Sequence, residues 1–217
     1  MGIPSYEGNL RKNSIKMPEA VYKASGIMIF GKKLKSFIFS TDIAIIRNCN
    51  ADAVIAVYPF TPQSIITDAI VQSSDIPVFS GVGGGVTRGL RVVTLANEAE
   101  RIGAMGVVMN APTSNEVIGM VKGSLEIPII ITITDTKTDI QARLDAGADI
   151  LNVSVGSKTA EVVRAIRKHF PDVPIIATGG PSEESILETI EAGANAITIT
   201  PPTTASLFKP LMNNYRK

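Results

Sequence analysis

Hydroxyl and amide side chains alternate with large aliphatic ones near the ends of three β-branched segments of this chain. These polar residues are Thr132 and Thr134, Asn152 and Ser154, and Thr198 and Thr200. Successive side chains of a strand point to opposite faces, so each pair shares one face of its strand. If that face lines a pocket, the six groups can hydrogen-bond a small polar molecule. The alternative is that threonine stands here because it is a common strand residue.

Two aspartates directly follow predicted strands, where a general base would reach a bound molecule. Asp42 and Asp135 hold these positions, and each is equally suited to capping the N-terminus of the next helix. Lys137 and Lys158 also follow strands closely, where an ammonium group either polarises a carbonyl, meets a phosphate or is simply solvated. We take Asp135, Lys137 and Asn152 as the candidate catalytic residues.

The densest glycine cluster is GVGGGVTRG, residues 81–89. Its spacing matches neither the GxGxxG dinucleotide motif nor the GK[ST] ending of a nucleoside-triphosphate loop. We therefore expect either a lid that folds over a ligand, with Arg88 contacting an anion, or a merely flexible connection.

Several types of catalytic centre lack the residues that they need. None of the predicted strands contains a lysine, which disfavours a Schiff-base aldolase with a buried amine. His169, the one histidine, lies near the end of a predicted helix, so neither a histidine-built metal centre nor a Ser-His-Asp triad can be assembled. Cys49, the one cysteine, rules out an internal disulfide and suits a buried position in a reducing compartment. We expect no metal site.

The elements that position these residues follow a repeated pattern of a β-branched segment, a polar turn and an amphipathic helix. Eight strands are predicted, at residues 36–40, 52–57, 76–82, 104–111, 127–134, 149–155, 173–180 and 195–200. This order predicts an α/β fold, a (β/α)8 TIM barrel over residues 36–217, in a single domain with an N-terminal extension at residues 1–35. An open doubly wound sheet is the competing architecture. In a barrel the strand ends meet at one rim, so the polar residues above converge.

An internal repeat supports the barrel. Two stretches, beginning at Ile127 and at Val173, align with each other at an offset of 46 residues. Each contains the sequence AGAD or AGAN, in which Gly147 or Gly193 can end a helix in the left-handed conformation.

Capping residues indicate where helices start. Thr61 before Pro62 suits the start of one helix, and Thr113 stands three residues before a glutamate, the spacing of a capping box. Residues 1–35 lie outside the repeat. We expect them to form a short helix and a hairpin that cover the bottom of the barrel.

The segment ATGGPSEES, residues 177–185, resembles the phosphate-binding turn after strand seven in the aldolase-type, ribulose-phosphate-binding superfamily of TIM barrels. The resemblance is strongest from about residue 127 to residue 200. It implies that Gly179, Gly180 and Ser182 bind a phosphate through backbone N–H groups and a helix N-terminus.

Two features depart from the pattern of that superfamily. Two prolines follow the last strand, where similar barrels place glycine and a small hydroxyl residue, and they remove two N–H donors. Thr203, Thr204 and Ser206 would replace these donors with hydroxyls. Glu183 and Glu184 already place negative charge at the N-terminus of the predicted helix, where it interacts favourably with the helix dipole. A capped turn that binds no phosphate therefore remains an alternative. The candidate ligand-binding residues are Gly179, Gly180, Ser182, Thr200, Thr203, Arg88, Thr134 and Ser154.

The composition excludes several partners. Lysine plus arginine (21) nearly cancel aspartate plus glutamate (20), so no field would hold a nucleic acid or an acidic membrane. Only 5% of the residues are aromatic and none is tryptophan, which leaves few rings to stack on bases. No apolar segment is long enough to span a membrane, and no secretory signal is recognisable, so we expect a cytoplasmic protein.

These observations favour an enzyme that acts on a small phosphorylated metabolite, as a lyase, an isomerase or a synthase, without a cofactor. An oxidoreductase that binds flavin mononucleotide (FMN) is one alternative, since several flavin barrels resemble this chain around its last two strands. A non-catalytic barrel that senses a metabolite or joins an assembly is another, because few ionisable residues follow the strands. A metal-independent hydrolase also stays open, and a homo-oligomer is compatible with each.

Overall fold

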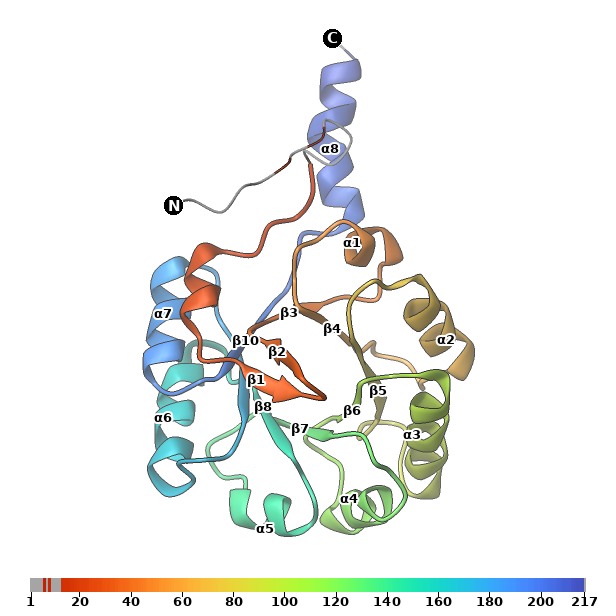
Figure 1. Ribbon diagram of the computed structural model, residues 1–217, viewed down its shortest axis with the longest axis vertical. Coiled ribbons are helices and arrows are strands. Elements are labelled where there is room, and N and C mark those ends of the chain that lie inside the picture. The colour runs from red at the N-terminus through yellow and green to blue at the C-terminus, as the bar shows by residue number, and fades with distance from the viewer. Residues whose placement is uncertain (1–5, 7, 9–12, 217) are drawn as a thin grey trace.

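A closed barrel of eight parallel strands forms the centre of the computed structural model, which describes residues 6, 8 and 13–216 (Figure 1). The other residues of the expected N-terminal extension, 1–5, 7 and 9–12, lie outside the described residues. The strands are β3 (Ser36–Phe39), β4 (Ala53–Ala56), β5 (Val78–Gly83), β6 (Gly106–Met109), β7 (Ile129–Ile133), β8 (Ile150–Val153), β9 (Ile175–Thr178) and β10 (Ala196–Ile199). Because β10 pairs with β3, the sheet closes on itself, which confirms the TIM barrel and excludes the open sheet.

Helices surround the barrel on its outside. They are α1 (Ile43–Arg47), α2 (Ser64–Ser73), α3 (Leu90–Ile102), α4 (Asn115–Lys122), α5 (Ile140–Asp145), α6 (Thr159–His169), α7 (Glu183–Glu191) and α8 (Thr204–Tyr215), with a 3-10 turn η3 (Gly156–Lys158) before α6. No helix in the part of the chain that the structure describes has the length and apolar character needed to cross a membrane.

Side chains alternate between the barrel interior and the helix-facing side of the sheet. The lower interior is filled by a cluster that includes Phe37, Ile55, Phe79, Val108, Ile130, Ile150 and Ile176. Their neighbours along the strands, such as Ile129, Ile131 and Ile175, pack outward against the helices. This division fixes the parity of every strand, and therefore tells which side chains near the strand ends face the lumen.

The 46-residue repeat corresponds to the same side-chain hydrogen bond between neighbouring strands, formed at two places in the barrel. Asp149 stands before β8, and its carboxylate accepts the N–H of Ile129 at the start of β7 at 2.9 Å. Asn195, which stands 46 residues later before β10, accepts the N–H of Ile175 at the start of β9, also at 2.9 Å. Gly147 and Gly193 precede them with φ of 110° and 112°, as expected for glycines that end helices in the left-handed conformation.

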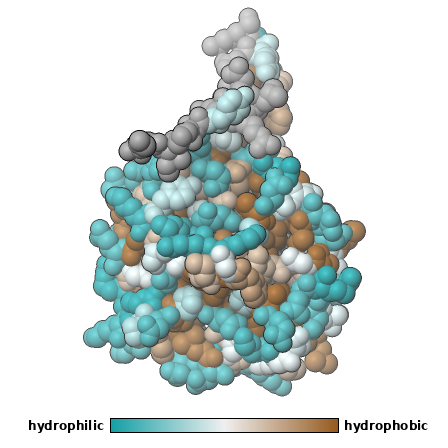
Figure 2. Space-filling model, in the orientation of Figure 1, coloured by the Kyte–Doolittle hydropathy of each residue, from teal (hydrophilic) through white to brown (hydrophobic). Residues whose placement is uncertain are grey.

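The N-terminal extension closes the lower end of the barrel. A 3-10 turn η2 (Glu19–Lys23) is followed by a hairpin of β1 (Ile27–Ile29) and β2 (Lys32–Leu34), which lies across the barrel opening in Figure 1. Ile27, Ile29 and Leu34 join the lower interior cluster, so the hairpin covers the bottom as predicted. Met28 and Phe30 remain exposed on its outer side, where Figure 2 shows hydrophobic colouring near the centre of this face.

The wall between α7 and α1 is filled by the N-terminal segment, residues 13–24. Val21 in η2 packs in the same core as Ile186 of α7, and Met17 packs in the same core as Ile45 of α1. A backbone bridge joins Ile15 to Cys49, just after α1. The last helix, α8, instead projects away from the barrel (Figure 1), and every described side chain from residue 205 to residue 216 is exposed.

Two predicted helix starts are wrong, one by two residues and the other by one. Helix α2 begins at Ser64 after Gln63, which makes no side-chain cap, so Thr61 and Pro62 belong to the preceding loop. Helix α4 is capped by Ser114, whose hydroxyl accepts from Val117 N at 3.4 Å. Thr113 instead donates to a carbonyl of the preceding turn, because its position closes the loop rather than opening the helix.

Candidate functional site

Polar side chains face the lumen directly above the interior aliphatic layer. Thr132, Asn152, Thr178 and Thr198 each follow a member of the interior cluster by two residues and so share its face. The Asn152 amide donates to Thr132 Oγ1 at 3.4 Å, and the Thr178 hydroxyl donates to Ser154 Oγ at 3.1 Å. The expected inward orientation is therefore present, while the binding role of these groups stays a prediction.

Buried polar atoms in this lumen, and one in the loop after β5, lack protein partners. Among the described residues, the buried side-chain atoms without a hydrogen bond are Thr87 Oγ1, Asn152 Oδ1 and Thr198 Oγ1. Thr198 is only 5% exposed. Leaving a buried hydroxyl unsatisfied costs about 1–3 kcal/mol, so such atoms mark places where another molecule completes the hydrogen bonding.

A cavity of about 620 Å³ opens between the ends of β9 and β10. It is lined by Lys16, Pro18, Thr178, Gly180, Pro181, Ser182, Glu183, Ile186, Thr198, Ile199 and Thr200. We call it the β9–β10 cavity. It brings together three of the predicted ligand residues, Gly180, Ser182 and Thr200, with the partnerless hydroxyl of Thr198.

The turn after β9 is held largely by its own side chains. The Ser182 hydroxyl accepts from Ser185 N at 3.3 Å, and the Ser185 hydroxyl accepts from Ser182 N at 3.2 Å, which together form a capping box on α7. The backbone N–H of Glu184 holds the pKa of that carboxyl below its ordinary value, and the Ser182 hydroxyl assists. Capping is thus present at this turn, whether or not it also binds an anion.

The two glycines of this turn have different roles. Gly180 has a φ of +75°, a left-handed conformation that side chains other than glycine rarely adopt. A Cβ on Gly179 would lie 2.6 Å from Ile197 Cγ2 and 2.9 Å from Ile186 Cγ1. Gly179 therefore allows α7 to pack closely on the sheet, and it does not line the cavity.

Asp135 and Lys137 lie away from the lumen. The Asp135 carboxylate accepts from Lys137 N and Thr138 N, each at 2.8 Å, and from the Thr138 hydroxyl at 3.0 Å. These hydrogen bonds, with that from Lys137 N the largest cause, lower the pKa of Asp135. Asp139, rather than Asp135, caps α5. Asp135 lines a groove between α5 and α6, next to His169, so its acid–base role stays a prediction without support from this geometry.

Other predicted residues hold the loops of the rim. Asp42 caps α1, which confirms one of the two roles predicted for it. The Thr204 hydroxyl donates to the Asp42 carboxylate and lowers the pKa of Asp42. Thr203 is exposed and caps α8 by accepting from Ser206 N at 3.1 Å. Arg88 is exposed and donates its Nε to Gly85 O at 2.9 Å, within its own loop.

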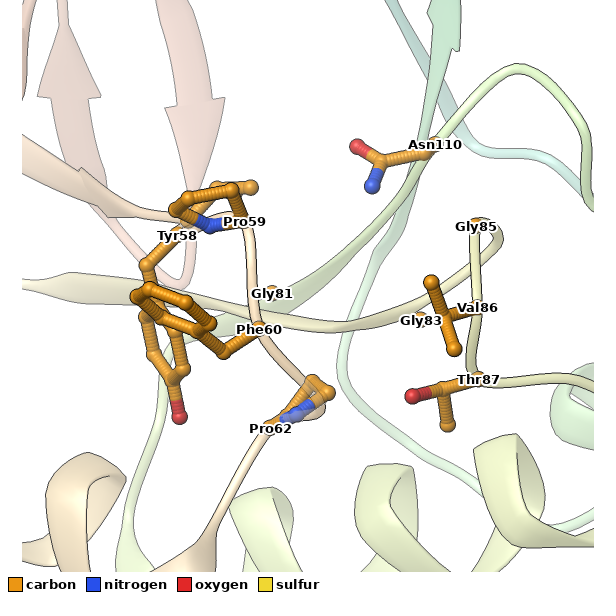
Figure 3. Close-up of a pocket in the computed structure, with 11 residues that line it drawn as sticks. Tyr58, Pro59, Phe60, Pro62, Gly81, Gly83, Gly85, Val86, Thr87 and Asn110 are labelled. Carbon is orange, nitrogen blue, oxygen red and sulfur yellow. The ribbon is translucent and has the colours of Figure 1, made fainter.

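Sequence reasoning missed part of the β9–β10 cavity. Lys16 belongs to the extension, for which only a position at the bottom was expected, so no signal placed it at the rim. Glu183 was interpreted solely as a partner of the helix dipole. Thr178 could have been found, since it stands two residues after the interior Ile176. A second cavity on the opposite wall, shown in Figure 3, was not foreseen either.

Comparisons with known proteins place the fold but no family. No protein-family model matches the chain. A segment of 69 residues is 36% identical to inosine-5'-monophosphate dehydrogenase of Halalkalibacterium halodurans, which is 30% of this chain and 14% of that enzyme. The chain thus matches only about a seventh of the curated relative.

Solved structures of similar fold share little sequence with the chain. Phosphoenolpyruvate phosphomutase of Streptomyces platensis subsp. rosaceus has a TM-score of 0.65 at 13% identity, over 91% of this chain and 83% of that one. A 2,3-dimethylmalate lyase, a PEP mutase/isocitrate lyase superfamily member, has a TM-score of 0.65 at 15% identity, over 94% of this chain and 84% of that one. Phosphonopyruvate hydrolase has a TM-score of 0.61 at 13% identity, over 85% of this chain and 80% of that one. These structures support the TIM-barrel part of the resemblance but not the ribulose-phosphate-binding superfamily that it named.

The donor set of this rim does not fit a carboxylate-bound magnesium ion. The phosphonopyruvate hydrolase structure is a complex with oxalate and Mg²⁺. Magnesium prefers carboxylate and other hard oxygen ligands. In the described residues of this chain, no group of three or more His, Cys, Asp and Glu side chains comes together, and the lumen-facing positions carry hydroxyls and an amide. We derive no chemistry through a metal.

Proposed function

We propose that this protein is an enzyme that acts on a small phosphorylated metabolite, as a lyase, an isomerase or a synthase, at the C-terminal rim of its barrel. The observation that carries the proposal is the β9–β10 cavity. It combines the N-terminus of α7, the left-handed Gly180 and the buried, partnerless hydroxyl of Thr198. Helix N-termini and hydroxyl donors suit the oxygens of a phosphate.

The charges around the cavity are consistent with an anion held on one side. Lys16 contributes a cation to the lining, and Glu183, in the first turn of α7, contributes a carboxylate. We assign the phosphate to the side of Lys16, Thr198 and Thr200. Glu183 is then the candidate for proton transfer in preference to Asp135, because Glu183 lines the cavity and the Asp135 carboxylate holds its own turn.

The similar proteins support a phosphorus-bearing ligand. The curated relative is named for a 5'-monophosphate, and two of the similar barrels are named for phosphoenolpyruvate and phosphonopyruvate. The reacting part of such a ligand would reach the lumen, where Asn152 Oδ1 lacks a partner and can accept from a substrate hydroxyl.

Ligand-dependent melting tests the phosphate site. Inorganic phosphate, glycerol 3-phosphate and ribose 5-phosphate are each expected to raise the Tm, because a ligand that binds only the folded state stabilises it. Thr198→Val should weaken this response, since it removes the hydroxyl without changing the shape of the side chain. Thr189→Val is the matched control, because Thr189 is equally buried but its hydroxyl donates to Ser185 O at 2.8 Å within α7.

A lack of any phosphate-dependent rise in Tm, or an equal loss in both variants, would contradict the proposed site. Turnover is tested separately by following product from the phosphate ester that gives the largest rise. Glu183→Gln is expected to reduce kcat at least a hundredfold if Glu183 transfers the proton.

A metabolite-sensing barrel without catalysis is the second candidate. The observation that favours it is the neutral lining of the lumen, in which Thr132, Asn152, Thr178 and Thr198 carry no titratable group. Binding of a phosphate ester without turnover, and with Glu183→Gln unchanged in affinity, would decide for this candidate. The flavin alternative is decided by colour, because a protein that takes up FMN absorbs near 450 nm.

A further inference from the structure

The second cavity lies on the wall opposite the β9–β10 cavity. It measures about 150 Å³ and is lined by Val57, Tyr58, Pro59, Phe60, Pro62, Gly81, Gly83, Gly85, Val86, Thr87 and Asn110. These residues come from the ends of β4, β5 and β6 and from the loops that follow them (Figure 3). In the order of the closed barrel, β5 stands four strands from β9 in either direction, so the two cavities share no lining residue.

The walls of this β4–β6 cavity are more apolar than polar, and hydrogen bonds hold the loops that form them. The Tyr58 hydroxyl accepts from Gln63 N at 2.8 Å, which fixes the ring against its own loop. On the other side, Gly84 N donates to Thr87 O at 3.0 Å and Asn110 N donates to Gly83 O at 2.9 Å, so the glycine-rich loop is tied down beside β6. The loop that was expected to form either a lid or a flexible connection is a hydrogen-bonded wall of the cavity in this structure.

Two large apolar side chains stand exposed at the mouth of the cavity. Phe60 is 74% exposed and Val86 is 88% exposed, and they come from the loops on its two sides. Exposing apolar surface to water is unfavourable in proportion to the area exposed. A ligand seated between these side chains would remove part of that cost.

A partnerless hydroxyl points to the polar part of the ligand. Thr87 is 3% exposed, lines the cavity, and its Oγ1 makes no hydrogen bond in the described structure. Figure 3 shows the Asn110 amide extending toward the same space from β6. Among the described lining residues there is no Asp, Glu, Lys, Arg or His, so the site suits an uncharged ligand.

We infer that the β4–β6 cavity binds a single uncharged six-membered ring that carries one hydroxyl or amino group. The volume sets the size, because an apolar protein cavity of about 150 Å³ holds benzene. Tyr58, Phe60 and Val86 contact the ring, and Thr87 Oγ1 hydrogen-bonds its polar substituent. The inference does not depend on the phosphate site across the lumen.

Binding of phenol, with toluene as the probe without a polar group, tests the inference by saturation-transfer NMR and calorimetry. Phenol is expected to bind, and Thr87→Val to weaken it about fivefold, the value of one hydrogen bond of about 1 kcal/mol. The same substitution should leave toluene unaffected. Val86→Ser should weaken both probes, because it removes an apolar contact at the mouth.

Two controls separate this site from its surroundings. Ile65→Ser removes another largely exposed apolar side chain, from α2 outside the cavity, and Thr198→Val removes the partnerless hydroxyl of the other cavity. Both should bind phenol like the unaltered protein. Absence of phenol binding, or phenol binding that survives both Thr87→Val and Val86→Ser, overturns the inference, whatever the outcome of the phosphate experiment.

Discussion

Replacing Thr198 by valine is expected to make the unliganded protein more stable. Thr198 is 5% exposed and its hydroxyl has no partner, whereas Thr189 is 3% exposed and its hydroxyl donates to Ser185 O at 2.8 Å. The same substitution at these two buried threonines therefore removes opposite contributions. At Thr198 it removes an unsatisfied polar group, and at Thr189 it removes a hydrogen bond.

The sizes of the two effects follow from the hydrogen-bond inventory. An unsatisfied buried hydroxyl costs about 1–3 kcal/mol, and a satisfied one contributes about 0.5–1.5 kcal/mol. For a domain of this length 1 kcal/mol corresponds to about 2–4 °C in Tm. Thr198→Val is then expected to raise the Tm by about 2–12 °C, and Thr189→Val to lower it by about 1–6 °C.

Calorimetric melting without phosphate, with urea unfolding as a second measurement, checks this pair. A Tm for Thr198→Val that falls as far as that for Thr189→Val would refute the reasoning, because it would show that the Thr198 hydroxyl is satisfied in the folded protein. A higher Tm together with a lost phosphate response would show that the hydroxyl is kept for binding at the expense of stability.

Three further outcomes are expected. Gly84→Ala should destabilise the protein by about 3 kcal/mol or more in urea unfolding, because the φ of Gly84 is +98° and a Cβ there would clash with the Thr113 hydroxyl. Gly85→Ala is the control and should change the stability little, because nothing lies within 4 Å of a Cβ at that position. Equal losses of stability in the two variants would contradict this explanation. The lowered pKa of Asp42 stabilises the folded protein at pH values above the pKa of Asp42 in the unfolded chain, and this stability is lost as the pH falls through the folded pKa. Thr204→Val should raise the folded pKa of Asp42 in an NMR titration, because it removes the hydroxyl that lowers it. An unchanged pKa would refute this cause. Removing residues 205–217, which keeps Thr204, should leave the Tm unchanged by calorimetry, because the described side chains from 205 onward are exposed. A large drop would show that α8 packs against a partner in solution.

The sequence predicted the barrel because its strands carry a strong periodic signal. Buried strands such as Ile129–Ile133 alternate polar and aliphatic residues at their ends, and the parity of Thr132 and Asn152 follows directly from that alternation. The positions of the strands depend on which residues are buried, and the alternation of aliphatic and polar residues along the sequence indicates this directly. The lumen-facing set could therefore be predicted residue by residue.

Loop geometry was less predictable, because several residues compete for the same local role. Asp135 and Asp139 both stand before α5, and only coordinates show that Asp139 caps the helix and Asp135 the preceding turn. Ser114 likewise displaces Thr113 as the cap of α4. Lys16 could not be placed, because nothing local to the extension tells which end of the barrel it reaches.

Closing the barrel with residues from the beginning of the chain has a consequence during synthesis. The seam between β3 and β10 pairs Ser36 with Ile197, so β3 waits for a partner that leaves the ribosome roughly 160 residues, or about 8–30 s, later. Val21 stays without its covering helix for much of that time, since α7 is made late. An early apolar residue of the nascent chain thus stays exposed until late in synthesis, when the native structure can bury it.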